Sequence, residues 1–188
     1  LPTPAYATLA AVKRGDYAAT RLIDQCVAVG LGAFEQLKNS SFSVGEVEKI
    51  CRVPLDGGLG LYGRIDRVDY SGDMVRVIDY KTGAIDSSAP LYYMGLKLQL
   101  PIYLSASASG RRAVGAYYFP AGVVYESKRD GVFRLSGYMD GSEDVVRSTE
   151  TCLQDKQKSS YVEAYLNGSA VDSAMSREDF ADFLLYSN

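Results

Sequence analysis

Two stretches decide the fold of this chain, GRIDRVD at residues 63–69 and VIDYKTG at residues 77–83. Both are rich in β-branched residues, and the turn-forming residues 71–73 (SGD) stand between them. They predict two antiparallel strands joined by a tight turn. Because residues two apart on a strand share a face, Asp79 and Lys81 should project side by side.

Periodicity predicts the elements around this hairpin. A helical spacing of apolar residues runs from Asp16 to Lys38 in spite of two glycines. Three strands joined by short turns should then form an antiparallel meander, at residues 43–55, 59–70 and 74–80. The third strand is nearly all apolar, which predicts a central place in the sheet.

The second half of the chain gives a weaker pattern. A helix is expected at residues 91–106, and Pro101 inside it should kink the helix or reshape its turn. A strongly aromatic strand is expected at residues 113–119. Beyond Pro120 the expected elements are short strands at residues 123–125 and 132–135 and helices at residues 143–153 and 177–186.

This order of elements predicts an α/β fold. Its core would be a helix, a three-stranded antiparallel meander, a helix and a strand, with a small C-terminal α+β extension. The chain has 188 residues, enough for one domain with a proper core. We expect residues 1–40 to lead into the core as a helical segment, residues 41–120 to form it, and residues 121–188 to add peripheral strands and helices.

Composition narrows the chemistry. The chain has no histidine, so a hydrolytic site would use carboxylates, lysine or tyrosine. Its formal net charge of -3 gives no general basic surface for nucleic acid, so local geometry or a partner would supply the attraction. Cys26, Cys51 and Cys152 are far apart, which favours reduced thiols and a cytoplasmic location. No apolar run reaches membrane-spanning length, so no membrane partner is expected.

The two acids and the lysine predict a metal site. If the hairpin register sets Asp66 beside Asp79, their carboxylates can hold a hard cation such as Mg²⁺. Glu48, or alternatively Glu46, on the preceding strand could supply a third carboxylate. A water activated near Lys81 could attack a phosphodiester, while the ammonium pairs with a phosphate oxygen.

The helix after these strands carries a polar pair. Gln99 and Tyr103 are four residues apart and share a face, so they could brace Lys81 or contact a DNA backbone. Ordinary structural interpretations stand beside these: an Asp-x-Lys pair is commonly a surface salt bridge, and the charges of residues 64–69 could be solvated. The order of the pieces favours a site, because an unpaired carboxylate at the end of a buried strand is costly without a ligand.

These motifs resemble the RecB-type nuclease domain of the PD-(D/E)XK superfamily, and most closely the nuclease domains of AddB-type proteins. The resemblance rests on residues 63–69, 78–83 and 99–104, with further likeness at residues 117–125 and 135–146. It implies a restriction-endonuclease-like core. It also implies a divalent-metal-dependent DNA exonuclease module of an ATP-dependent helicase–nuclease in double-strand break repair and recombination, with DNA ends or single strands and a helicase–nuclease subunit as partners.

Residue by residue, the resemblance assigns metal binding to Asp66, Asp79 and the Tyr80 carbonyl, with Mg²⁺ or Mn²⁺ as the cofactor, and catalysis to Lys81 with the helix motif. The family usually has an upstream histidine, and its iron–sulfur members have four cysteines; this chain has neither set. We therefore expect a fragment of a longer protein, with an iron–sulfur cluster only in that longer chain. We also expect the fragment alone to be weakly active or inactive.

Two other functions stay open. The first is a catalytically weak or inactive nuclease-like domain with a structural or DNA-guiding role, which missing upstream ligands would support. The second is a metal-dependent hydrolase of small phosphoesters, although the sequence has no Gly-rich phosphate loop and no histidine ligands.

Overall fold

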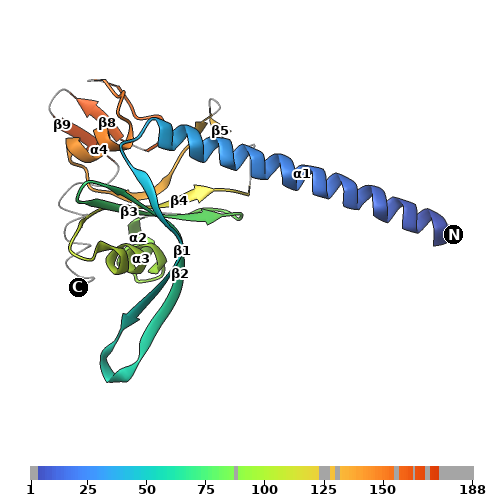
Figure 1. Cartoon of the computed structure of the whole chain (residues 1–188), viewed down its shortest axis with the longest axis horizontal. Coiled ribbons are helices and arrows are strands. Elements are labelled where there is room, and N and C mark those ends of the chain that lie inside the picture. The colour runs from blue at the N-terminus through green and yellow to red at the C-terminus, as the bar shows by residue number, and fades with distance from the viewer. Residues whose placement is uncertain are drawn as a thin grey trace.

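A five-stranded sheet forms the centre of the molecule. A computed structural model of the chain describes residues 4–86, 89–122, 128–129, 132–154, 157–162, 164–167 and 170–173. The strands lie in the order β1-β2-β3-β4-β7 (Figure 1). They are β1 (Ser43–Pro54), β2 (Gly60–Ser71), β3 (Met74–Lys81), β4 (Arg112–Pro120) and β7 (Ser136–Met139).

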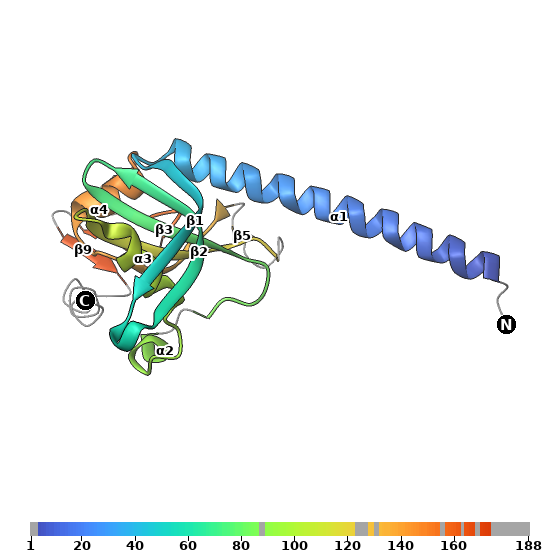
Figure 2. The same ribbon diagram turned by 60° about the horizontal axis from the view of Figure 1, so that its bottom comes forward.

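Helices cover both faces of this sheet. The C-terminal half of α1 (Pro4–Lys38) packs on one face, and α3 (Gln99–Ala108) packs on the other through Leu100 and Leu104 (Figures 1 and 2). The N-terminal half of α1 extends away from the sheet. The remaining elements are the 3₁₀ turn η1 (Asp56–Gly58), the helices α2 (Ala89–Tyr93) and α4 (Glu143–Thr149), and two small hairpins, β5 (Lys128–Arg129) with β6 (Val132–Phe133) and β8 (Ala164–Asn167) with β9 (Ala170–Ser173).

The predicted meander is confirmed. β1 pairs with β2 and β2 pairs with β3, both antiparallel. β3 is the third of five strands, and residues 75–79 within it are buried. Both of its faces are covered by helices, which explains its nearly continuous apolar sequence. The restriction-endonuclease-like α/β class predicted from the sequence is therefore the observed one.

The parallel pairing of β3 with β4 places α3 over the end of β3. Asp79 lies opposite Tyr118 in this pairing. Parallel neighbours need a long crossover connection, and here the segment with α2 and α3 makes it. The crossover therefore brings the first turn of α3 to the strand end that carries Asp79 and Lys81.

The single kinked helix predicted at residues 91–106 is wrong. The structure has two helices, separated by a turn in which Gly95 adopts φ +69° and donates its N–H to the Tyr92 carbonyl at 2.9 Å. A residue without Cβ suits that conformation, and it ends α2. Pro101 is the third residue of α3, where a backbone N–H has no partner within the helix, so it starts a helix instead of kinking one.

α1 begins twelve residues before the helix predicted from Asp16, at Pro4, and runs through both glycines. A Cβ at Gly32 would overlap the ring of Phe133 on β6, so the missing side chain allows helix and strand to approach. Gln25 donates its amide to the Ala121 carbonyl just after β4, a second tie to the body. In the described part of the chain no helix is both long and apolar enough to cross a membrane.

The C-terminal third departs most from the prediction. The strand expected at residues 132–135 ends at Phe133, and a separate strand, β7, follows and pairs antiparallel with β4. The helix expected at residues 143–153 ends at Thr149. β7, β8 and β9 were not predicted, because each has only four residues, too few for an alternating pattern to show. The predicted strand at residues 123–125 and helix at residues 177–186 lie outside the described residues.

A charged cluster joins the end of β7 to the start of β4. Arg112 lies 2.5 Å from Asp140 and 2.5 Å from Asp144, and Ser142 donates two hydrogen bonds to Asp140, at 2.9 Å and 2.6 Å. Burial raises the pKa of Asp140, but the hydrogen bonds from Ser142 and Arg112 outweigh it, so this pKa lies below its usual 3.8.

Asp140→Asn should therefore lower the free energy of unfolding at pH 7 by about 1–3 kcal/mol. A carboxyl whose folded pKa is lowered contributes stability above its unfolded pKa and loses it as pH falls through the folded pKa. The difference between variant and parent should thus shrink below about pH 4. Urea denaturation at neutral and acid pH checks this, with exposed Asp73→Asn as the control; a difference that does not change with pH would contradict it.

Candidate active site

The candidate site lies where β2 and β3 separate. Their backbone pairing ends at Arg67 and Ile78, so Asp66 and Asp79 occupy the next position in the same register. Beyond this point β2 continues with β1 as a hairpin that extends away from the sheet (Figure 1). The Oδ2 of Asp66 accepts a hydrogen bond of 2.8 Å from the backbone N–H of Tyr80. The two acids thus meet at the fork between the strands, in the register that the hairpin sequence predicts.

Asp79 is buried, with 3% of its surface exposed. Its Oδ1 accepts a hydrogen bond of 2.7 Å from the Gln99 amide. Its Oδ2 lies 2.6 Å from the ammonium of Lys81, at an angle outside hydrogen-bond geometry, and has no hydrogen bond with the described residues. Burial raises the pKa of Asp79 above its usual value, Lys81 opposes that change, and the nearby charge of Asp66 adds to it.

Lys81 and Gln99 form a closed triangle with Asp79. The ammonium of Lys81 donates to Oε1 of Gln99 at 3.0 Å and lies 5.3 Å from the centre of the Tyr118 ring. The amide of Gln99 must present its NH₂ to the carboxylate and its oxygen to the ammonium, since the opposite orientation would be repulsive at both ends. Gln99 therefore fixes the relative positions of the acid and the cation.

Tyr103 lies apart from this triangle. A Cβ on Gly63 of β2 would lie 2.6 Å from Cε1 and 3.0 Å from the hydroxyl of Tyr103, so the ring packs on bare backbone. Tyr103 is half-buried in the cluster that includes Cys51. The structure thus brings Gln99 to Lys81 but places Tyr103 at the base of the hairpin, one helical turn further on.

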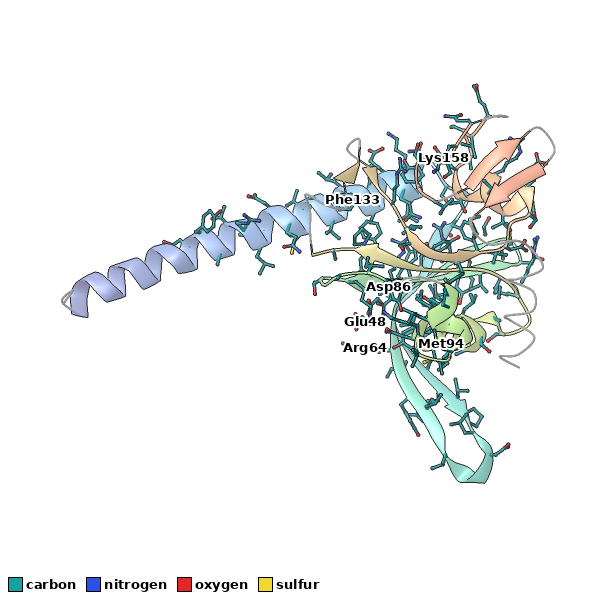
Figure 3. All side chains as sticks on the ribbon, turned by 180° about the vertical axis from the view of Figure 1, so that it is seen from behind. Glu48, Arg64, Asp86, Met94, Phe133 and Lys158 are labelled. Atoms are coloured by element: carbon teal, nitrogen blue, oxygen red, sulfur yellow. The ribbon has the colours of Figure 1, made fainter. Side chains whose placement is uncertain are left out.

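The two candidate third acids are both in ion pairs. Glu48 has φ +52°, a left-handed conformation at an irregular point of β1, and its carboxylate lies 2.7 Å from Arg64. Figure 3 shows these two side chains where the hairpin leaves the body. Glu46 lies 2.6 Å from Lys49 and accepts a hydrogen bond of 2.7 Å from Tyr70. Neither glutamate completes a carboxylate cage with Asp66 and Asp79 in this arrangement.

The residues present fit a hard divalent cation in their chemistry. Asp79 has a buried carboxylate oxygen without a hydrogen bond, Asp66 stands next to it, and a main-chain carbonyl follows at Tyr80. Mg²⁺ takes such oxygen ligands and keeps several waters, so a site need not be all protein. Within the described residues no three acidic or cysteine side chains come together as a preformed metal cage, and the three cysteines lie on separate segments.

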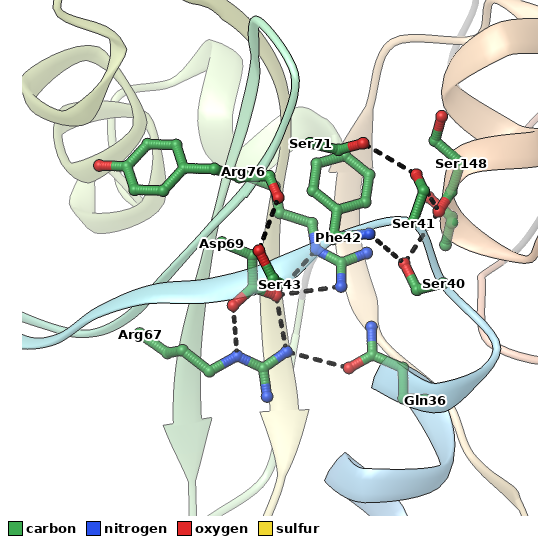
Figure 4. Close-up of polar contacts among 12 residues, drawn as sticks. Gln36, Ser40, Ser41, Phe42, Ser43, Arg67, Asp69, Ser71, Arg76 and Ser148 are labelled. Atoms are coloured by element: carbon green, nitrogen blue, oxygen red, sulfur yellow. Dashed lines mark hydrogen bonds and ion pairs between the residues drawn. The ribbon is translucent and has the colours of Figure 1, made fainter.

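Sequence reasoning missed a buried polar network on the opposite face. Arg67 donates to Oε1 of Gln36 on α1 at 3.0 Å and to the Tyr80 hydroxyl at 2.9 Å. Arg67 is also paired with Asp69, and both are buried (Figure 4). The solvated interpretation is wrong for these two residues and holds for the exposed Arg64. Tyr80, between Asp79 and Lys81, is thereby anchored to α1. No local pattern could show it, because its members are far apart in sequence.

The turn after β4 also supports the site. The backbone N–H groups of Ala121 and Gly122 both donate to the Lys81 carbonyl, at 2.7 Å and 3.2 Å. A Cβ on Gly122 would overlap the backbone of Thr82, so glycine is required for this approach. The chain direction after Lys81 is thus fixed by a segment forty residues away.

This geometry, with two acids and a lysine on neighbouring strands at the edge of a mixed sheet, matches what a family comparison finds. A model described as the PD-(D/E)XK nuclease superfamily matches residues 5–180, and the chain belongs to this superfamily.

Two curated relatives are each described as one of the subunits of an ATP-dependent helicase/deoxyribonuclease. The protein from Lachnoclostridium phytofermentans is 35% identical over 134 residues, which cover 68% of this chain and 12% of the relative. The protein from Carboxydothermus hydrogenoformans is 29% identical over 173 residues, which cover 78% of this chain and 15% of the relative. The chain therefore spans a small part of the length of the relatives that it matches.

Proposed function

We propose that this chain hydrolyses DNA phosphodiester bonds with the help of Mg²⁺ or Mn²⁺, as the exonuclease module of a helicase–nuclease in double-strand break repair. Membership of the nuclease superfamily supports the reaction class. The description of the relatives supports DNA as the substrate, an ATP-dependent helicase and a further subunit. The three unpaired cysteines agree with a reducing, cytoplasmic location.

One observation carries the proposal, the buried Oδ2 of Asp79 that has no hydrogen bond with the described residues. A buried carboxylate oxygen is costly unless it is satisfied by a donor or a cation. Lys81 offsets part of the charge of Asp79, and Asp66 adds a second negative charge beside it. A divalent cation would satisfy both acids at once.

The roles follow from the contacts. Asp66, Asp79 and the Tyr80 carbonyl would hold the cation, and Glu48 would join them only by leaving Arg64. When bound, the cation would lower the pKa of a water and offset the negative charge that develops on the phosphate.

Lys81 and Gln99 would act on the substrate side. Lys81 keeps its ammonium at the strand end, where it can bind an oxygen of the scissile phosphate or hold the proton that the attacking water loses. Gln99 orients Lys81 through the hydrogen bond at 3.0 Å. Tyr103 supports the base of the hairpin, so we propose a positioning role for it.

A second candidate is a weakly active domain that guides DNA. The ion pair of Glu48 with Arg64 favours it, because only two carboxylates converge among the described residues. Titration with Mn²⁺ separates the two candidates, since absence of binding at Asp66 and Asp79 would favour the guiding role.

The direct test incubates the chain with end-labelled single-stranded and duplex oligonucleotides in EDTA, Mg²⁺ or Mn²⁺. We expect slow cleavage that requires either cation and is absent in EDTA, because the acids cannot activate water alone. DNA binding without cleavage in any cation would contradict the proposal and support the guiding role. Turnover of a chromogenic phosphoester without DNA cleavage would instead identify a hydrolase of small phosphoesters.

A further inference from the structure

A pocket of about 360 Å³ opens beside Lys81 on the α3 side of the sheet. Its volume falls at the small end of the range of about 300–1,000 Å³ that is typical of small-ligand sites. Lys81 and Gln99 form its boundary with the paired acids, so a molecule in this pocket would lie next to the proposed point of cleavage. The pocket is therefore a candidate for part of the substrate other than the scissile phosphate.

One side of the pocket is apolar. Leu96 and Leu98 line it and are 67% and 48% exposed, and Ile85 and the buried Tyr118 also line it. Large apolar side chains left in water around a concave site mark a place that an apolar ligand can cover. The flat face of a nucleobase has that character and is bound without regard to sequence.

The other side carries charge. Lys97 lines the pocket, is half-buried, and makes no ion pair or hydrogen bond with the residues that the structure describes. Lys81, in contrast, is already held by Asp79 and Gln99. Asp86 also lines the pocket, and its carboxylate would repel a phosphate but can accept a hydrogen bond from the amino group of a base. Lys97 is thus the cation best placed to take a phosphate here.

We propose that this pocket binds the nucleotide adjacent to the scissile phosphate. Its base lies against Leu96 and Leu98, and its phosphate pairs with Lys97. This assignment rests on the proposed nuclease function for its orientation, and it adds a substrate-binding residue outside the recognised motifs.

The test is binding of a short labelled single-stranded oligodeoxynucleotide in EDTA, measured by fluorescence anisotropy over a range of salt concentrations. Lys97→Ala should weaken binding and reduce the slope of log affinity against log salt by about 0.7, the loss of one phosphate contact on a single strand. Lys97→Arg should restore the slope. Lys38→Ala is the matched control, because it removes an exposed lysine from α1 on the opposite side of the sheet, and it should bind as the parent does.

The apolar side is tested with an oligonucleotide that lacks the base at its terminal nucleotide. The parent should bind it more weakly than the complete strand, and Leu98→Ser should bind both equally with the salt slope of the parent. The assignment is overturned if Lys97→Ala behaves as Lys38→Ala, if the missing base makes no difference to the parent, or if the parent does not bind. It is also overturned if free deoxyadenosine monophosphate competes as strongly as the strand, since the pocket would then belong to a free nucleotide.

These outcomes are independent of catalysis. A parent that shows the predicted binding pattern but no cleavage in Mg²⁺ or Mn²⁺ would contradict the proposed function and leave the pocket assigned. A parent that cleaves DNA while Lys97→Ala and Leu98→Ser bind normally would contradict the pocket and leave the proposed function in place.

Discussion

Asp79→Asn should reduce the rate of metal-dependent DNA cleavage by this chain about 10²- to 10⁴-fold. Asp79 supplies the buried oxygen that has no hydrogen bond with described residues, and it lies opposite Asp66 at the strand fork. A catalytic cation contributes several kcal/mol, and each 1.36 kcal/mol is worth about tenfold in rate. Single-turnover cleavage of a labelled oligonucleotide in Mn²⁺ measures the loss.

The same variant should be at least as stable as the parent in EDTA. Burial and the charge of Asp66 raise the pKa of Asp79 in spite of Lys81. A carboxyl whose folded pKa lies above its unfolded value opposes folding once it is ionised, so the cost is present at neutral pH and absent in acid. Asparagine removes that cost. The melting temperature in EDTA should therefore not fall, whereas the increase that Mn²⁺ gives the parent should disappear.

The matched control for this experiment is Asp24→Asn, which changes an exposed aspartate on α1. It should keep both the cleavage rate and the Mn²⁺-dependent increase in melting temperature. A large loss of stability in Asp79→Asn in EDTA would identify Asp79 as part of a structural ion pair with Lys81. Cleavage at the parent rate would exclude Asp79 as a metal ligand.

Asp69→Asn should lower the free energy of unfolding by about 3–5 kcal/mol, a large part of the roughly 5–15 kcal/mol typical of a domain. Asp69 is fully buried between two arginines (Figure 4). Arg67 donates to both of its oxygens at 2.8 Å, and Nε of Arg76 donates to Oδ2 at 3.0 Å. Without the carboxylate, two buried guanidinium groups would be left without a counter-charge.

Arg76 makes this loss severe. It is fully buried, and burial lowers its pKa in opposition to the attraction of Asp69. Its guanidinium lies 4.1 Å from the centre of the Phe42 ring, a contact that stabilises the cation but cannot replace a carboxylate. Asp69 is the one carboxylate that the described residues place against this group.

Urea denaturation of the parent and Asp69→Asn measures the effect, with Asp73→Asn, in the exposed turn that joins the same two strands, as the control. The double variant Asp69→Asn with Arg76→Met should recover part of the lost stability, because it removes one of the two unpaired charges. A loss below about 1 kcal/mol, the level of an exposed ion pair, would show that water reaches the arginines.

The meander and the relation of its acids could be predicted from the sequence because they depend on neighbours along the chain. The turn at residues 71–73 sets the register, and the period of two places Asp79 and Lys81 on one face. The apolar run before Asp79 required a central strand, which β3 is. The signals for these features lie within about twenty residues.

The remaining features depend on contacts between distant segments. The turn at Gly95, the fit of Gly32 against Phe133 and the short strand β7 have weak local signals, because each depends on what packs against it. The pairing of Glu48 with Arg64 likewise required the irregular point in β1, which a pattern of alternating residues does not show.

The sequence by itself determined that two acids and a lysine would meet at the end of a hairpin, since strand period and turn position are local properties. Only the tertiary structure decided which charges are buried. Arg67 and Asp69 belong to the same alternating run as Arg64 and Asp66, yet they lie beneath α1 and bond Gln36 and Tyr80. The physical reason is that burial depends on what covers a strand, and here that cover comes from a helix about thirty residues earlier in the chain.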